Sequence, residues 1–520
     1  MHLQIKDISI MAKVVFKDYS QGQISLFPTR LDEKIPEDSP ARLVNQVVDN
    51  LDIRSIMDGY QGGGCSAYHP RMIMWLSGNH IPDHNTINRF RSTHLKASIH
   101  ELFTQVITLL VEMGHLSLNV VYVDGTKIES KANKYTFVWR KSVEKHKVKL
   151  EEKIRQVLQQ VEEGIAGDNQ ADDEPPTPIN SEELKKRIAA INRENRSKEE
   201  QKAIKTVEDK YLPKLEEYEK HLETLGNRNS YSKTDPAATF MRMKEDHMMN
   251  GQLKPAYNVQ IGTENQFITH YDFYPNPTDY LTFKPFMNGF EKRYKKFPAK
   301  VVGDSGYGSE ENYKYMEIND IEGFVKYPMF HKEQKKSFQT NAFLAQNLYY
   351  NAAKDYFVCP MGQHLENVGK GTRKSENGFV SNVSYYEAQN CEGCPLKCLC
   401  NNAKGNRRIE INHQLNAYRK KSRELLTSPE GLMHRSKRPI EPEAVFGQTK
   451  ANKQYNRFRH FGGDKVKMDF AIFAIAFNLG KMHKKANNTN NPAPKRIISP
   501  KLAVLKSILD FYPQQINMAA

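Results

Sequence analysis

Three acidic residues stand in sequence contexts that can present them to a metal ion. Asp124 ends the apolar run 118–123, and Asp304 ends a second run, 299–303. Glu443 lies in the segment PEAVFG, where we expect a helix to begin and to run to about residue 453. Mg²⁺ prefers a few carboxylates together with water and phosphate oxygens. Two strand ends and a helix therefore predict a site suited to attack on a phosphodiester, although each acid alone is equally typical of a surface cap.

Seven segments carry a family resemblance through their joint order and spacing. They are YHPRM (68–72), WLSGNHIPDHNTINRFR (75–91), VYVDGTKIES (121–130), KPAYNVQI (254–261), GDSGYGSEEN (303–312), CEGCP (391–395) and EAVFGQTK (443–450). With them the chain resembles the DDE transposases of bacterial insertion sequences, and most of all the group numbered eleven-eighty-two. The resemblance implies an α/β fold with a ribonuclease-H-like mixed-sheet core.

The resemblance also implies the roles of the acids. Asp124, Asp304 and Glu443 would together hold two Mg²⁺ (or Mn²⁺) ions, one activating the attacking oxygen and one stabilising the leaving oxygen. Glu441 is the competing acid. We choose Glu443 because the family acid lies three residues before a phenylalanine, here Phe446.

The function implied is that of a metal-dependent transposase. It would bind the element's terminal inverted repeats, cleave the DNA at the ends, and join the freed 3′ ends to target DNA by strand transfer. Because two ends must be cut and joined together, we expect a homo-oligomer. Two alternatives remain open: a ribonuclease-H-like, structure-selective DNA nuclease without strand transfer, and a catalytically inactive relict that binds DNA and represses.

Composition agrees with a nucleic-acid partner. The 520 residues carry a formal net charge of +15, which favours an anionic partner, although a basic protein without a specific partner has the same balance. The longest apolar run, 470–477, is far shorter than the roughly 20 residues that a membrane helix needs. The N-terminus has no signal-peptide pattern. We therefore expect a cytoplasmic, nucleoid-associated protein without a membrane segment.

The order of the patterns predicts several regions. A Lys/Glu-rich stretch with a heptad-like seam at Leu150, Ile154, Val157 and Val161 interrupts the strand-forming segments and predicts an antiparallel helical hairpin.

We expect an N-terminal helical DNA-binding domain at 1–115, the core at 116–136 and 230–330, the hairpin insertion at 137–229, a Cys-rich insertion at 331–430, the last catalytic helix and a C-terminal helix at 431–485, and a tail at 486–520. YHPRM and WLSGN are joined directly near 72–74, where the family has a longer helical stretch, so the N-terminal domain is expected to be shortened.

Four basic residues are candidates for DNA contact. Lys450 follows Glu443 by seven residues, two helical turns on, and can hold a phosphate. Arg89 and Arg91 lie just inside an expected helix at 82–91, which could enter a DNA groove or be an ordinary surface helix. The family also has an arginine and a tyrosine upstream of its acid. Those positions are Pro439 and Ser436 here, and Arg438, one residue out of register, is offered as the substitute.

Five of the six cysteines lie between Cys359 and Cys400. Cys391 and Cys394 have the C-x-x-C spacing of a structural zinc site, which Cys359 and Cys400 can complete. Cys398 is an extra candidate, and the resemblance favours Cys400. A structural Zn²⁺ would stabilise this insertion, and the alternative is a cluster of reduced thiols.

Overall fold

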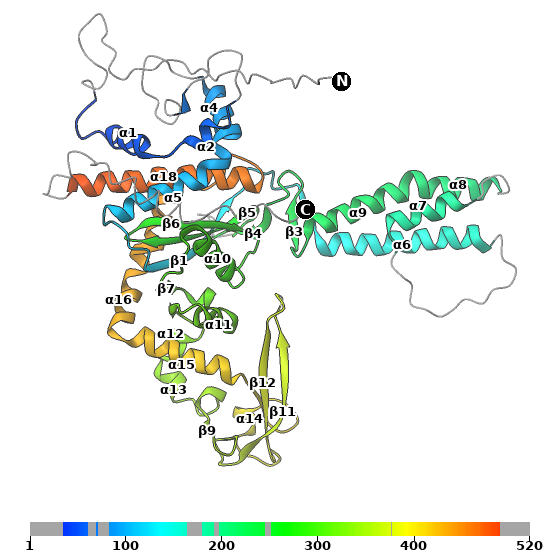
Figure 1. Ribbon diagram of the computed structural model, residues 1–520. Helices are drawn as coiled ribbons and strands as arrows, with labels where there is room; N and C mark the ends of the chain where they lie inside the picture. Colours follow the sequence, from blue (N-terminus) through cyan, green and yellow to red (C-terminus); the bar gives the residue numbers. More distant parts are fainter. Residues whose placement is uncertain are drawn as a thin grey trace, which may run out of the picture.

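The computed structural model describes residues 35–60, 69–70, 83–163, 179–191, 197–244, 251–375 and 377–488 (Figure 1). Statements about the structure concern these residues. The expected junction near 72–74 and the tail beyond 488 lie outside them. No helix in these ranges is both long and apolar enough to cross a membrane.

A mixed sheet forms the centre of the described chain. Its strands are β1 (Val120–Glu129), β4 (Thr239–Arg242), β5 (Leu253–Glu264), β6 (Phe267–Tyr274), β7 (Lys300–Gly303) and β8 (Glu322–Val325). The order is β4-β5-β1-β7-β8, with β6 also paired to β5. β1, β7 and β8 run parallel, whereas β5 is antiparallel to β1, β4 and β6. The expectation of an α/β fold with a mixed sheet is confirmed.

β5 and β6 form an antiparallel hairpin. Its turn contains Asn265 and Gln266, both with positive φ (53° and 62°), which matches the right-handed twist of the flanking strands. The expected end of β1 is wrong. β1 does not stop at Asp124 but continues to Glu129, because residues 125–129 keep their antiparallel pairing with β5 after the pairing with β7 has ended.

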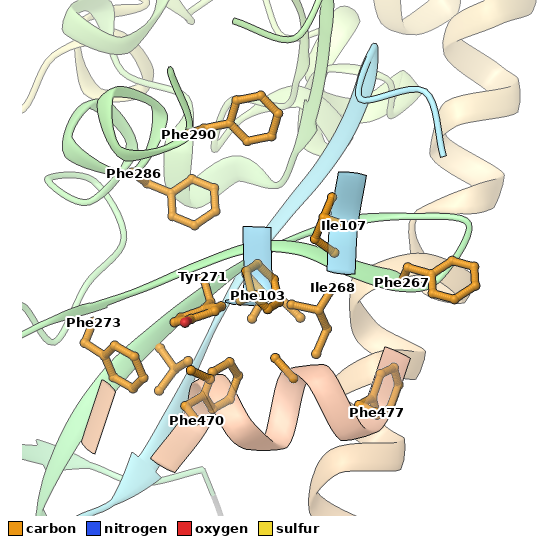
Figure 2. Close-up of a cluster of buried hydrophobic side chains, with 14 of the residues drawn as sticks. Phe103, Ile107, Phe267, Ile268, Tyr271, Phe273, Phe286, Phe290, Phe470 and Phe477 are labelled. Carbon is orange, nitrogen blue, oxygen red and sulfur yellow. The ribbon is translucent and has the colours of Figure 1, made fainter. Parts of the chain in front are cut away.

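Helices cover both faces of the sheet. They include α5 (Lys96–Glu112), α10 (Phe283–Tyr294), α11 (Glu310–Ile318) and α18 (Gly463–Asn488). Figure 2 shows Phe470 and Phe477 of α18 directed toward β6, where Phe470 lies 5.3 Å from the ring of Tyr271. Phe286 and Phe290 of α10 are fully buried in the same core. α18 is the C-terminal helix expected within 431–485, and it continues to Asn488.

The N-terminal described segment adds short helices over α5 and α18: α1 (Pro40–Asn50), α2 (Arg54–Met57), α4 (His84–Phe90) and the π-helical η2 (Arg91–Leu95). α1 begins with Pro40 in its first turn, and the side chain of Ser39 accepts a hydrogen bond from the amide of Ala41. α4 is capped by Asp83, which accepts from the amide of Asn85. α4 agrees with the helix expected at 82–91.

The insertion after β1 projects from the core as long helices (Figure 1). It consists of β2 (Phe137–Trp139), α6 (Arg140–Glu163), α7 (Ser181–Ala190), α8 (Lys198–Thr206), η3 (Val207–Tyr211), α9 (Leu212–Leu225) and β3 (Ser230–Ser232). Leu150, Ile154 and Val161 of the predicted seam are buried in a core shared with α7, α8 and α9. Val157 is only partly buried, and Leu158 is buried in this core instead. The second arm is divided into separate helices, and β2 pairs with β3 to close the base.

The cysteine region forms a second sheet of five described strands in the order β13-β12-β11-β10-β9. Its elements are α12 (Phe330–Glu333), α13 (Lys336–Gln339), η5 (Ala345–Asn347), β9 (Tyr349–Asn351), β10 (Tyr356–Val358), β11 (His364–Lys374), β12 (Val380–Ala388), α14 (Lys397–Cys400), β13 (Arg408–Ile411) and α15 (His413–Thr427). α15 packs back on the central sheet, where Ser422 Oγ donates to the carbonyl of Val325.

The helix expected to start at Glu443 is also different. Glu443 lies inside a continuous helical run formed by α16 (Pro429–Lys437), η6 (Pro439–Glu443), α17 (Ala444–Gly447) and η7 (Gln448–Asn452). η6 and η7 are π-helical. Pro439 and Pro442 lack the amide hydrogen that an α-helical turn needs, so the turn that carries Glu443 widens.

Asp235 connects three parts of the core and provides a test of this packing. It is fully buried and accepts hydrogen bonds from Ser130 Oγ (2.6 Å), Tyr257 OH (2.8 Å) and the amide of Gly462 (3.1 Å). Asp235→Ala leaves these donors without a partner and should lower the free energy of unfolding by roughly 3 kcal/mol or more. Urea denaturation followed by circular dichroism measures this. The exposed control Glu182→Ala should change it by less than about 0.5 kcal/mol, and equal effects would contradict the role of Asp235.

Candidate active site

Asp124 and Asp304 occupy equivalent places on two neighbouring parallel strands. Tyr122 of β1 pairs with Val302 of β7, and each aspartate follows its paired residue by two positions. Both carboxylates accept a backbone amide: Asp124 Oδ1 from Gly125 at 2.9 Å, and Asp304 Oδ1 from Gly306 at 2.7 Å. The strand register therefore brings these two predicted acids to one edge of the sheet.

Arg438 joins the third acid to this pair. Its guanidinium contacts Glu443 directly and lies 3.3 Å from Asp124 Oδ1 and 3.7 Å from Asp304 Oδ2. Only 11% of the Arg438 side chain is exposed, and its Nε is buried without a hydrogen-bond partner. All three predicted acids thus share one buried cation, and that cation is the arginine predicted one residue out of register.

Burial and charge act in opposite directions on Asp124. Burial raises its pKa from 3.8 to about 6, the charge of Arg438 lowers it, and the neighbouring carboxylates Asp304 and Asp279 raise it again. A metal ion competes with a proton for this group, so occupancy by a cation should fall below about pH 6.

Glu441 lies elsewhere. Only 7% of it is exposed, and it accepts a hydrogen bond from the amide of Gln266 at 2.7 Å, in the turn between β5 and β6. Burial raises its pKa, and this amide together with the charge of Lys481 opposes the shift. Glu441 therefore attaches the helical run to the sheet, whereas Glu443 faces Arg438.

The sequence did not single out Asp279. Its Oδ1 accepts hydrogen bonds from Asn258 Nδ2 and Gln260 Nε2, both at 2.8 Å. A Cβ on Gly125 would lie 2.8 Å from Asp279 Oδ1 and 2.1 Å from Gln260 Nε2, and one on Gly306 would lie 3.5 Å from Asp279 Cβ. Asp279 thus lies against the glycines that follow the two aspartates. Its sequence signal is the pair of buried amides in β5, which need a partner.

Basic side chains surround the acids. Lys326, directly after β8, has a pKa lowered by burial and by the charges of Arg438 and Arg435, while Asp304 and Glu443 oppose the shift. Lys450 donates to Thr126 Oγ1 at 2.7 Å and to the carbonyl of Lys127 at 2.9 Å. Lys450 therefore lies along β1, two residues beyond Asp124.

The two N-terminal arginines lie in different environments. Arg89 is exposed near the end of α4. Arg91 forms an ion pair with Asp469 at 3.1 Å, and its side chain is 24% exposed. This pair attaches η2 to α18, which favours a structural role for Arg91 over the predicted contact with DNA.

The four predicted cysteine ligands line one small cavity of about 20 Å³, enough for one water-sized guest: Cys359, Cys391, Cys394 and Cys400. Cys398 is exposed and does not line it. Arg407 donates from its backbone to Cys391 Sγ (3.3 Å) and from its guanidinium to Cys400 Sγ (3.0 Å).

Neither cluster is a formed metal cage. Within the described ranges, no group of three or more His, Cys, Asp or Glu side chains is arranged to hold a metal ion. The donor types nevertheless fit: hard carboxylate oxygens suit Mg²⁺ or Mn²⁺, and four thiols suit Zn²⁺. At the acidic site, binding requires the guanidinium of Arg438 to yield its place.

Comparison with known families gives one match. The family described as "Transposase DDE domain" matches residues 358–483, which include the cysteines, Arg438, Glu443 and Lys450 but neither Asp124 nor Asp304. A search of curated proteins found no match. The family match supports a DDE transposase, that is, an enzyme that acts on DNA, and this family generally uses a divalent metal.

The raised pKa of Asp124 predicts a cost in stability. The folded protein holds the proton more tightly than the unfolded chain, so folding is penalised as the pH rises from about 4 through 6. Asp124→Asn should therefore stabilise the metal-free protein by about 3 kcal/mol at pH 7.5 and by only about 0.5 kcal/mol at pH 4. Thermal unfolding at the two pH values measures this.

The control for this experiment is Asp320→Asn, the same change at an exposed loop position with positive φ, which asparagine tolerates. It should alter the melting temperature little at either pH. A destabilised Asp124→Asn protein at pH 7.5 would show that the Asp124 charge contributes net stability through Arg438.

Proposed function

We propose that this protein is the transposase of an insertion sequence of the eleven-eighty-two type, with a ribonuclease-H-like core. It binds the element's terminal inverted repeats, cleaves DNA at the ends, and joins the freed 3′ ends to target DNA. The observation that carries the proposal is the convergence of Asp124, Asp304 and Glu443 on Arg438. The family match over residues 358–483 supports it.

The three acids are proposed as ligands of Mg²⁺ or Mn²⁺. When bound there, divalent ions supply an activated oxygen nucleophile and stabilise the leaving oxygen. Both reactions are displacements at phosphorus by an oxygen, so neither requires a covalent bond between DNA and protein. The acids come from two strands and one helical run, so their spacing is maintained by the core.

Arg438 has a second role in this proposal. Without metal it neutralises the acids, and with metal bound its guanidinium becomes available to a DNA phosphate, for which its forked donors are well suited. Lys326 and Lys450 flank the same edge and can each hold a further phosphate. The basic groups would thus fix the scissile strand, while the acids serve the chemistry.

Joining two DNA ends in one event requires two active sites, so we propose that the protein works as a homo-oligomer on chromosomal DNA in the nucleoid. The projecting helices α6, α7, α8 and α9 are one candidate contact between copies. Arg89 remains a candidate for DNA contact on the N-terminal side.

Strand cleavage and joining by purified protein tests the function. The substrate is labelled duplex taken from the DNA that flanks the gene, with Mg²⁺ or Mn²⁺. Glu443→Gln should reduce end-specific cleavage and joining on the order of 100-fold or more, because it removes a metal-binding charge. Glu441→Gln is the matched control. It should lower thermal stability but keep activity, since Glu441 contacts the turn of β5 and β6 instead of the site.

Other outcomes favour other functions. Binding to the ends without any cleavage favours an inactive DNA-binding relict. Cleavage without preference for the ends and without joining favours a structure-selective nuclease. If Glu443→Gln and Glu441→Gln lose the same activity and have the same melting temperature as each other, the result would contradict the specific assignment of Glu443 to the active site.

For the cysteines we propose a structural Zn²⁺ held by Cys359, Cys391, Cys394 and Cys400. The purified protein should contain about one zinc per chain by elemental analysis. Cys391→Ser should lose the metal and lower the melting temperature, because zinc binding stabilises the folded insertion. Cys398→Ser, outside the cavity, should keep both. Zinc-free protein with an unchanged melting temperature after chelation would favour reduced thiols.

A further inference from the structure

Three lysines lie together beside the acids. The pKa of Lys450 is lowered to about 8 by burial and by the charges of Lys244 and Lys127, and the pKa of Lys127 is lowered by burial and by Lys244, with Asp279 opposing. In the described part of the chain, none of the three has a carboxylate within ion-pair distance. A group of like charges that repel each other is costly unless an anion joins it, so this group is arranged for a polyanion.

An aromatic groove lies beyond the lysines, at the base of the projecting helices where β2 and β3 leave the core. Its open volume is about 450 Å³, and it is lined by Lys134, Tyr135, Phe137, Trp139, Phe240, Gln252 and Leu253. The rings of Phe137 and Trp139 each lie 6.0 Å from Phe240. Tyr135 is 73% exposed and Phe137 51% exposed. Large rings left open to solvent mark a binding surface.

Contacts along the sheet connect the two features. Lys450 binds the β1 backbone at Lys127, and Lys127 Nζ in turn donates to the carbonyl of Arg242 at 2.8 Å. Arg242 pairs with Leu253, which lines the groove. A continuous path thus runs from Asp124 past the lysines to the aromatic rings.

The path follows the part of β1 that is no longer paired with β7. The pairing with β7 ends at Tyr122, and Lys450 contacts β1 beyond this point, at Thr126 and Lys127. From Asp124 to Glu129, where β1 ends, the strand rises about 17 Å.

We propose that this path binds an unpaired segment of DNA next to the cleavage site, with phosphates on Lys450, Lys127 and Lys244 and bases stacked on Phe137 and Trp139. Identification of the polymer as DNA rests on the proposed function. Aromatic rings stack on any base, because every base has a π face, but only where the base is not paired inside a duplex. The protein would in this way hold open the DNA end that it cuts.

A second copy of the chain fits the groove less well. A symmetric dimer contact buries the same patch on both subunits, so it would bring two copies of the lysine group toward each other. Lys134 adds a further cation, 5.1 Å above the Tyr135 ring. Charge complementarity therefore favours a nucleic-acid strand over another protein surface of the same charge.

Trp139 offers a direct measurement. The chain has two tryptophans, so in a Trp75→Phe protein fluorescence reports on Trp139 alone. Titration with a 15-nucleotide oligothymidylate, without added divalent metal, should quench this fluorescence. Phe137→Ala should weaken binding of the oligothymidylate about 10-fold or more. The affinity for a 15-base-pair duplex, measured by fluorescence anisotropy, should change far less. Phe137→Tyr should bind like the parent.

Two controls separate stacking from general charge. Tyr349→Ala removes a ring that is 66% exposed on the distant strand β9 and should leave both affinities unchanged. Lys244→Gln should reduce the salt dependence of oligothymidylate binding by about 0.7 in the log–log slope, the value of one phosphate contact on a single strand.

The inference is overturned if the oligothymidylate causes no quenching, or if Phe137→Ala leaves its affinity unchanged. A shift of Phe137→Ala to a smaller assembly in sedimentation, with strand binding intact, would instead assign the groove to contact between copies. Strand binding without any metal-dependent cleavage would count against the proposed function and not against this path, and cleavage without strand binding would count against this path alone.

Discussion

Three carboxylates cannot occupy one corner of a folded protein without a positive charge among them, and in this chain Arg438 supplies it. Its guanidinium contacts Asp124, Asp304 and Glu443 while most of its side chain is buried. The placement of the acids therefore depends on a residue from a distant part of the sequence. The charge of Arg438 also explains why Asp124 tolerates its burial, because the arginine offsets part of the rise in the pKa of Asp124.

The surrounding architecture serves this arrangement. The parallel register of β1 and β7 fixes two acids at one edge, and the widened turn at Pro439 and Pro442 sets the angle of the third. Glu441, two residues from Glu443, attaches the same helical run to the turn of β5 and β6. Of two acids in one short segment, Glu441 thus contacts the sheet and Glu443 contacts Arg438.

Several elements could be predicted from the sequence because their signals are local. The helix α4, the helical insertion after β1 and the C-terminal helix α18 all lie where the pattern placed them. The predicted element boundaries were wrong where strand pairing or the backbone chemistry of proline determines the boundary. β1 continues past Asp124 because β5 still pairs with it, and Glu443 lies within a helix because two prolines widen the turn without ending it.

The sequence by itself determined the mixed α/β class and the grouping of the cysteines, and it selected three acids that the structure places around Arg438, because residue type and periodicity are properties of short segments. Only the tertiary structure decided that Arg438 neutralises all three acids, that Asp279 lies against Gly125 and Gly306, and that Arg91 is held by Asp469. These contacts join residues as much as 378 positions apart. Their partners are selected by packing and charge in three dimensions, and no periodicity along the chain encodes them.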